Sequence, residues 1–364
     1  MKTKFLAVIT GIIIILTSLS GCSCSSMTIL EFNHNFYGTE SNLPSNYTEV
    51  CEYDVYLDDE GVNSSIKDNL PKISGKLVTT FESSSTMKDK LKNLLKDTPS
   101  DLLDDANTRG VDVYRFATDF SVSVQHECIK SDNNIEGINY DTIKTEVYFF
   151  SQGASYAPIY TTTSYNYTSF AINEENSACA VIFSKCSTLY QKNKYTLTES
   201  YAQNQADLDK EKNISTKTIN YTYKTLVDNA QLLFLVRNMD VLKDTNSYLP
   251  TVSYQYDEAK ELMFMNLGSN ATGADFSVDY TLNQNLINCN KSILKTIAFK
   301  INSQYNSGAL QSFSVQEKEA TETEGSLPFK SLLYKYEKPL LEYSSNTSIG
   351  TLVHELKKVE ITDK

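Results

Sequence analysis

The stretch that decides the fold is "CEYDVYL", residues 51–57. Its apolar and polar side chains fall on opposite faces of an extended chain, Cys51, Tyr53, Val55 and Leu57 against Glu52, Asp54 and Tyr56. An alternation with a period of two residues predicts a half-buried β-strand. The stretch "ISGKLVTTFE" at 73–82 has the same character, and we expect it to be the neighbouring strand.

Strand patterns recur along the rest of the chain. They cover residues 110–129, 142–150, 157–170, 194–201, 215–223, 296–315 and 350–361. The polar segment between 201 and 215 is either a domain linker or a hairpin loop, and the matching patterns on its two sides favour a long hairpin. A second hairpin is expected to turn at Asn306-Ser307-Gly308.

Helical patterns are few and short. Residues 86–97 place Met87, Leu91, Leu94 and Leu95 on one side, and a second short turn is expected from Pro99 through Leu103. The strongest helix signal covers 226–239, where Asp228 can cap the helix and Gln231 follows three residues later.

This order of elements shows no regular alternation of strands and helices, which excludes a doubly wound parallel sheet. We therefore predict a mainly β fold. The expected architecture is a large curved antiparallel sheet, or an open or half barrel, with a few short helices covering one opening.

The N-terminus has the anatomy of a signal peptide. Lys2 and Lys4 precede an apolar run, Phe5 to Leu16, and small residues then lead into Cys22. The alternative is an uncleaved transmembrane helix, but the run is shorter than the roughly 18–20 residues that span a bilayer. Cleavage before Cys22 is therefore favoured.

The stretch "LSGC" at 19–22 resembles the lipobox of bacterial membrane lipoproteins. The resemblance implies that the thiol of Cys22 receives a diacylglyceryl group, that the chain is cut before it, and that acyl chains such as palmitate hold it on the extracytoplasmic face of the cell membrane. Residues 1–21 would then be the signal peptide, 22–45 the lipidated N-terminus and a flexible tether, and 46–364 a single β-rich extracytoplasmic domain.

The charge balance excludes some classes of binding partner. The chain carries 33 basic and 45 acidic residues, a formal net charge of −12. Such a chain is repelled by nucleic acid and by anionic lipid headgroups. We expect no nucleic-acid partner, and we expect membrane attachment to come from the acyl chains on Cys22.

Cysteines are sparse and do not form a dense disulfide framework. After Cys22 and Cys24, the chain has Cys51, Cys128, Cys179, Cys186 and Cys289. On one strand Cys179 and Cys186 would lie on opposite faces about 23 Å apart, too far for a disulfide. Each is expected to be a small buried apolar residue.

The candidate metal sites are weak. "HEC" at 126–128 would place His126 and Cys128 on one face of a strand with Glu127 on the other, but zinc would need further, distant ligands. "DNNIEG" at 132–137 begins like a calcium loop, yet its twelfth position is Ile143 where a glutamate is needed, which favours a polar turn. The acidic loops 57–61 and 103–107 could hold an ion only weakly.

Motifs of nucleophilic or nucleotide chemistry are missing: the sequence has no G-x-S-x-G, no Walker loop and no G-x-G-x-x-G. We therefore predict no enzymatic activity and name no catalytic residue, metal or cofactor.

Three further segments resemble uncharacterised exported β-rich proteins of a domain-of-unknown-function family: "YAPIYTTTSYNY" (156–167), "VDNAQLLFLVRNMDV" (227–241) and "KPLLEYSSNTSIGTLVHEL" (338–356). The resemblance implies an exported, sheet-rich body and assigns no functional residue.

Two functions remain open. The first is a non-enzymatic envelope protein that scaffolds or binds another surface component through a broad polar sheet. The second is a carrier that holds a lipid or other apolar ligand within a curved sheet. A carrier needs an apolar cavity that its own side chains leave empty, whereas a scaffold needs a filled core.

Overall fold

The computed structural model describes residues 28–29, 46–60, 62–96, 98–129, 137–152, 155–172, 177–202, 204–208, 214–223, 225–238, 247–254, 258–270, 274–282, 285–287, 290–293, 296–303, 306–316, 340–347 and 349–363. Cys22, the whole of the lipobox and residues 130–136 lie outside these ranges. None of the helices within these ranges has both the length and the apolar character needed to cross a membrane.

The strands of the described chain are β1 (Thr28–Ile29), β2 (Asn46–Asp58), β3 (Lys72–Ser84), β4 (Val113–Gln125), β5 (Ile138–Gln152), β6 (Ser155–Ile172), β7 (Ser177–Tyr190), β8 (Lys194–Ala202), β9 (Ile214–Asn220), β10 (Val227–Asp228), β11 (Ser247–Val252), β12 (Lys260–Asn270), β13 (Ala274–Ser277), β14 (Asp279–Leu282), β15 (Asn285–Ile287), β16 (Asn290–Ile293), β17 (Thr296–Ser303), β18 (Asn306–Gln316), β19 (Leu340–Thr347) and β20 (Gly350–Asp363). The helical segments are α2 (Ser64–Lys67), α3 (Met87–Leu95), α4 (Asp101–Thr108), α5 (Gln205–Leu208), η1 (Asn229–Gln231), α6 (Leu232–Leu235) and η2 (Val236–Asn238).

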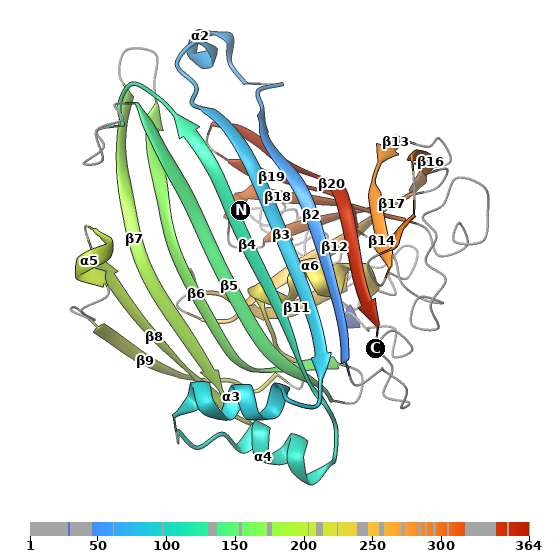
Figure 1. The fold of residues 1–364 in the computed structure, drawn as a ribbon. Coiled ribbons are helices and arrows are strands. Elements are labelled where there is room, and N and C mark those ends of the chain that lie inside the picture. The colour runs from blue at the N-terminus through green and yellow to red at the C-terminus, as the bar shows by residue number, and fades with distance from the viewer. Residues whose placement is uncertain are drawn as a thin grey trace, which may run out of the picture.

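Antiparallel pairing of successive strands builds one large curved sheet (Figure 1). From β9 it runs through β8, β7, β6, β5, β4 and β3 to β2, which pairs with the C-terminal strand β20. Beyond β20 the order continues through β19, β18, β17 and β12 to β11. Within the described residues the series stays open, so the fold is mainly β with an open sheet, as predicted.

The parallel pairs within the described chain are short, with two to four residues each. The two residues of β1 and the two of β10 run parallel to β11, and β14 runs parallel to the end of β20. β1 lies inside the segment 22–45 that the sequence assigns to a tether.

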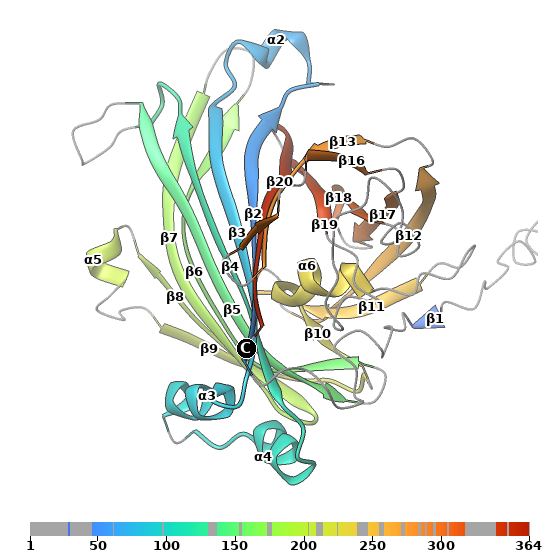
Figure 2. The ribbon, with the colours of Figure 1, turned by 45° about the vertical axis from the view of Figure 1, so that its right-hand side comes forward.

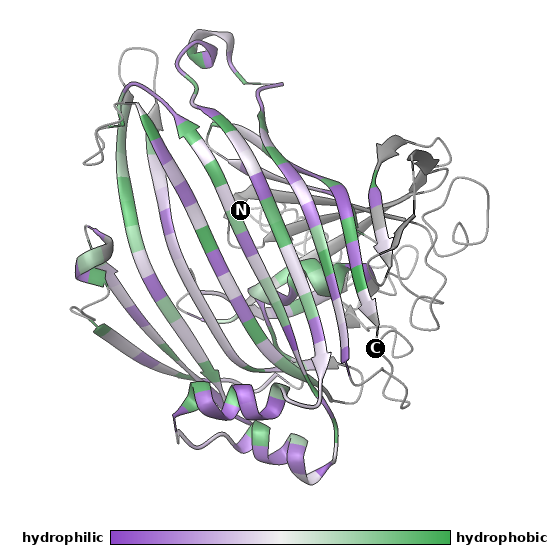
Figure 3. Cartoon of the chain, in the orientation of Figure 1, coloured by the Kyte–Doolittle hydropathy of each residue, from purple (hydrophilic) through white to green (hydrophobic). Residues whose placement is uncertain are grey.

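The period-two patterns form strands because each strand has one face toward the core. In β2, Cys51, Tyr53 and Val55 are buried, while Tyr56 on the other face is exposed. Figure 3 shows the hydrophobic and hydrophilic positions alternating along the strands from β2 to β6. The predicted pairing of 51–57 with 73–82, and the hairpin of β8 and β9, are both confirmed.

The short helix α6 packs on the inner face of the sheet. Figure 2 shows this short helix lying between the long strands β2–β7 and the strands β11 and β12. Phe234 of α6 is fully buried. Its ring centroid lies 5.1 Å from that of Phe81 in a stacked arrangement, 5.2 Å from Phe149, and 5.7 Å from both Phe116 and Tyr156. Burying one such ring contributes about 1.5–3 kcal/mol, so this contact fixes the helix against the sheet.

A second apolar cluster lies where α3 and α4 pack against one end of the sheet (Figure 1). The helices contribute Met87, Leu91, Leu95, Leu102, Leu103 and Ala106. The predicted place of Leu94 in this cluster is wrong, because its side chain lies at the edge of the buried arc and is 44% exposed.

The second helix also differs from the prediction of a turn from Pro99 through Leu103. It starts at Asp101, because the Ser100 hydroxyl caps it by accepting a hydrogen bond from the Leu103 N–H at 3.2 Å. It runs to Thr108, so residues 103–107 are helical and not the acidic loop that the sequence suggested.

The predicted helix over 226–239 is much shorter in the structure. The backbone of Val227 and Asp228 pairs with β11, so no helix can begin before Asn229, and only Leu232–Leu235 is α-helical between two 3₁₀ turns. The predicted cap is confirmed: Asp228 Oδ1 accepts from the Ala230 N–H at 2.8 Å, and Gln231 Oε1 accepts from the Asp228 N–H at 2.9 Å.

The turn predicted at Asn306-Ser307-Gly308 falls earlier. Ser303 at the end of β17 lies opposite Asn306 at the start of β18, so the three residues belong to the strand. The pairing of Asn306 with Ser303 opens the ladder with β17, and the register shifts before the next pair, Ile301 with Gln311.

A buried ion pair links the helical segment to β2. Arg237 Nη1 lies 2.5 Å from Glu49 Oε1, and Nη2 lies 3.2 Å from Oε2, with both residues almost fully buried. This bidentate geometry suits a guanidinium and a carboxylate. The Tyr47 hydroxyl also donates to Glu49, at 3.4 Å, so the carboxylate is held by several groups.

We expect Arg237→Met to lower the free energy of unfolding by about 3–5 kcal/mol, because it leaves the Glu49 carboxylate buried without its cation. Chemical denaturation at neutral pH measures the loss. The double variant Glu49→Leu/Arg237→Met should recover a substantial part of it. Lys67→Met, which removes an exposed pair with Asp59 at 3.4 Å, should change stability by less than about 1 kcal/mol. Equal losses for Arg237→Met and Lys67→Met would contradict this account.

His354 of β20 is a buried neutral base. Its Nδ1–H donates to the Tyr343 carbonyl oxygen at 3.1 Å, and its ring stacks on that of Tyr343 at 4.6 Å. Burial lowers the pKa of His354 to about 4 from the ordinary value of 6.5. The unfolded chain therefore binds a proton between pH 6.5 and 4 that the folded chain does not, and stability falls as the pH drops through that window.

We expect this residue to account for about 3 kcal/mol of stability lost between pH 6.5 and pH 4. The variant His354→Asn keeps a donor for the Tyr343 carbonyl but has no titrating group. Unfolding free energies of the two proteins, measured across this range, should converge as the pH falls. Parallel curves would show that His354 does not set the acid sensitivity.

Candidate functional site

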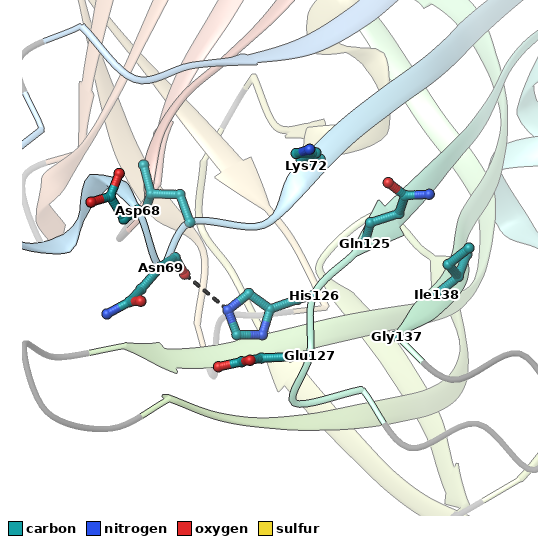
Figure 4. A pocket seen from close by; sticks show the side chains of 9 residues that line it. Asp68, Asn69, Lys72, Gln125, His126, Glu127, Gly137 and Ile138 are labelled. Atoms are coloured by element: carbon teal, nitrogen blue, oxygen red, sulfur yellow. Dashed lines mark hydrogen bonds between the residues drawn. The ribbon is translucent and has the colours of Figure 1, made fainter.

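A pocket of about 500 Å³ opens at the end of the sheet where α2, β3 and the β4–β5 turn meet (Figure 4). One wall comes from residues 68–70 and Lys72, which connect α2 to β3. The other comes from residues 125–127 and 137–138 of the β4–β5 turn. The lining is mostly polar, with the acidic side chains of Asp68 and Glu127 and the basic side chain of Lys72.

Local hydrogen bonds fix both walls. Asn63 caps α2 by accepting a hydrogen bond from the Ser65 N–H at 3.1 Å. In the β4–β5 turn the His126 N–H donates to the Gly137 carbonyl at 2.8 Å, and the Gly137 N–H donates to Ile129 at 3.2 Å. Gly137 has φ +81°, a left-handed conformation that glycine adopts without strain and most other residues do not.

His126 lies between the two walls. Its Nε2 is 2.9 Å from the Asn69 carbonyl oxygen, the interaction drawn in Figure 4. A carbonyl oxygen only accepts, so Nε2 carries the hydrogen and Nδ1 is the unprotonated nitrogen, with a lone pair that accepts. That lone pair accepts from the Cys128 N–H at 3.1 Å and faces the Cys128 Sγ at 2.9 Å. The contacts thus define one tautomer, with a base directed at a thiol.

The triplet 126–128 differs from the prediction in its backbone. β4 ends at Gln125, so these residues form a turn and not a strand. His126 and Cys128 still lie on the same side, because the turn brings the thiol back to the ring, and Glu127 is exposed. Across the described residues, no three side chains of the His, Cys, Asp and Glu types gather into a group that could hold a metal ion.

The structure describes only some of the other candidate ion sites. Residues 130–136, which include most of the calcium-like segment, lie outside the described residues, as does Cys22. In the acidic segment 57–61, Asp58 accepts from the Glu60 N–H at 2.9 Å, and Asp59 lies 3.4 Å from the Lys67 ammonium. These oxygens are used within a polar turn.

The cysteines of the described residues are thiols, not disulfides, and they differ in their burial. Cys51 and Cys186 are buried, whereas Cys128 and Cys179 are half-buried. The prediction of a small buried residue is therefore confirmed for Cys186 and wrong for Cys179, which lies near the start of β7. Cys179 and Cys186 both belong to β7 and are not joined. Burial raises the pKa of the Cys186 thiol to about 12, which keeps it protonated.

Two groups of this region have no sequence signal of their own. Asn69 contributes only a backbone carbonyl to His126, and Phe170 of β6 packs its ring edge-on to the imidazole at 5.4 Å. Only the three-dimensional structure shows that these two residues contact His126.

Comparison with protein-family models, with curated proteins and with solved structures finds no match to this chain.

Proposed function

We propose that this is a lipid-anchored extracytoplasmic protein with a non-enzymatic role, binding or scaffolding another component of the cell envelope. The position of α6 supports a binding protein over a ligand carrier. Phe234 is fully buried against four aromatic rings of β3, β4, β5 and β6, so the chain's own side chains occupy this part of the inner face. A ligand carrier would need that space.

The outer face supports the same proposal. It carries a ladder of ion pairs: Arg115 lies 2.6 Å from both Glu82 and Glu146, in three neighbouring strands. Two exposed tyrosines lie on this face, Tyr56 (41% exposed) and Tyr140 (59% exposed). A broad surface of charged groups and tyrosines suits polar, hydrated contacts with another macromolecule.

The anchor in this proposal is Cys22 with its acyl chains. Two chains, at about 0.8 kcal/mol per buried methylene, hold a protein stably where one does not. With a net charge of −12, the body is repelled by anionic headgroups. Residues 23–27, which precede β1, would then tether the sheet to the membrane.

The first test is mass spectrometry of the full-length protein purified in mild detergent. We expect the native and denatured spectra to give the same mass, because the acyl groups on Cys22 are covalent and no further ligand is held. A larger native mass, with the difference recovered in organic solvent, would overturn the binding role in favour of the carrier.

A matched variant calibrates this test. Phe234→Ala should open a cavity in the inner face and bind a hydrophobic dye, as empty apolar cavities do. The wild-type protein should not. Dye binding of equal strength by both proteins would also favour the carrier.

The second test addresses the anchor. We expect Cys22→Ala to abolish acylation and release the protein from the membrane fraction, since no other acyl acceptor lies in the lipobox. Cys24→Ala is the control and should remain in the membrane fraction. Membrane retention of the Cys22→Ala protein would sink the lipoprotein assignment.

A further inference from the structure

Two thiols from distant parts of the chain meet beside the pocket. Cys128 lies in the β4–β5 turn and Cys179 near the start of β7. Cys179 lies opposite Phe170 in the β6–β7 pair, and the Phe170 ring contacts His126, whose Nδ1 is 2.9 Å from the Cys128 Sγ. The neighbouring Cys128 thiol also contributes to the raised pKa of the Cys179 thiol, after burial, which is its main cause.

We propose that Cys128 and Cys179 form a redox-active dithiol that closes to an intramolecular disulfide by exchange with a disulfide-bearing oxidant. The bond would join the β4–β5 turn, which lines the pocket, to β7. It goes beyond the proposed envelope role and does not depend on it.

The geometry suits this bond. A disulfide needs an S–S distance of about 2.05 Å. Both cysteines adjoin the same pair of rings: Cys179 lies opposite Phe170 in the β6–β7 pair, and Cys128 contacts His126, on which Phe170 packs. Cys128 lies in a turn and not in a strand, so its backbone can supply the remaining movement without breaking the ladder between β4 and β5. Cys51 and Cys186, in contrast, are almost fully buried in β2 and β7.

The exchange starts at Cys128. Its S–H transfers the proton to the unprotonated Nδ1 of His126, and the thiolate attacks one sulfur of the oxidant's disulfide. That S–S bond breaks, a mixed disulfide forms on Cys128, and the leaving thiolate takes the proton back from His126. Cys179 then loses its proton to the second leaving group as its sulfur attacks the Cys128 Sγ. Overall, two protein thiols are oxidised to one disulfide, and one disulfide of the oxidant is reduced to two thiols.

The two cysteines differ in a way that sets this order. Burial, with a smaller contribution from the neighbouring Cys128 thiol, raises the pKa of Cys179 to about 12, so Cys179 stays protonated until a mixed disulfide is next to it. Cys128 faces the lone pair of His126. The thiolate, not the thiol, is the nucleophile, so Cys128 attacks first.

Peptide mapping of the full-length protein tests the bond. The reduced protein is incubated with oxidised glutathione, blocked with a maleimide and cut with trypsin. Cleavage at Arg115, Lys130, Lys144 and Lys185 places Cys128 in peptide 116–130 and Cys179 in peptide 145–185, while Cys186 falls in the separate peptide 186–192. We expect a disulfide-linked pair of 116–130 and 145–185 that dithiothreitol releases, with 186–192 carrying the maleimide.

The proposal is overturned if both peptides carry the maleimide after oxidation, or if 116–130 links instead to 186–192 or to the peptide of Cys289. Cys128→Ser and Cys179→Ser should each abolish the link, and Cys186→Ser should preserve it. Loss of the link in the Cys186→Ser protein alone would equally contradict the pairing.

A rate measurement tests the part given to His126. His126→Gln should slow closure at least about tenfold, because a positioned base typically contributes more than that, while the linked peptides remain those of Cys128 and Cys179. Closure at the wild-type rate would remove His126 from the reaction.

Discussion

The structure depends on the buried pair between Arg237 and Glu49. A guanidinium and a carboxylate away from water are destabilising unless each is matched in geometry by the other, so Arg237 can be buried only where Glu49 lies. That requirement fixes η2 on the inner face of β2. Phe234, one turn earlier, is thereby set against Phe81 on the neighbouring strand, and the curved sheet closes around α6.

The two faces of the sheet differ in the kind of side-chain contact that they make. The inner face carries one core, with the rings around Phe234 and the charges around Glu49, and at one end of the sheet the outer face packs on the second core, which α3 and α4 cover. The outer face carries partly exposed ion pairs such as those of Arg115, and pairs of this kind contribute little to stability. Stability therefore places little constraint on these ion-paired side chains, which leaves them available for contact with water or with a partner.

Local signals predicted the elements that local physics determines. The strands β2, β3, β8, β9 and β20 follow from a period of two. The capping of the helical turn by Asp228, with Gln231 three residues later, also follows from the local sequence. The long helix over 226–239 failed because the backbone of Val227 pairs with β11, a partner more than twenty positions away. At the site, the sequence placed His126 and Cys128 together but not Asn69 or Cys179, since both arrive through tertiary pairing.

Asn69 belongs to the pocket wall, and its carbonyl also binds His126, the residue next to the thiol pair. By accepting the Nε2 hydrogen of His126, this carbonyl leaves Nδ1 unprotonated toward Cys128, so the residues that connect α2 to β3 determine whether the thiol has a base. Movement of that wall would remove the base, and closure of a disulfide on Cys128 would in turn hold the opposite wall to β7. The two walls are thus coupled through a single imidazole.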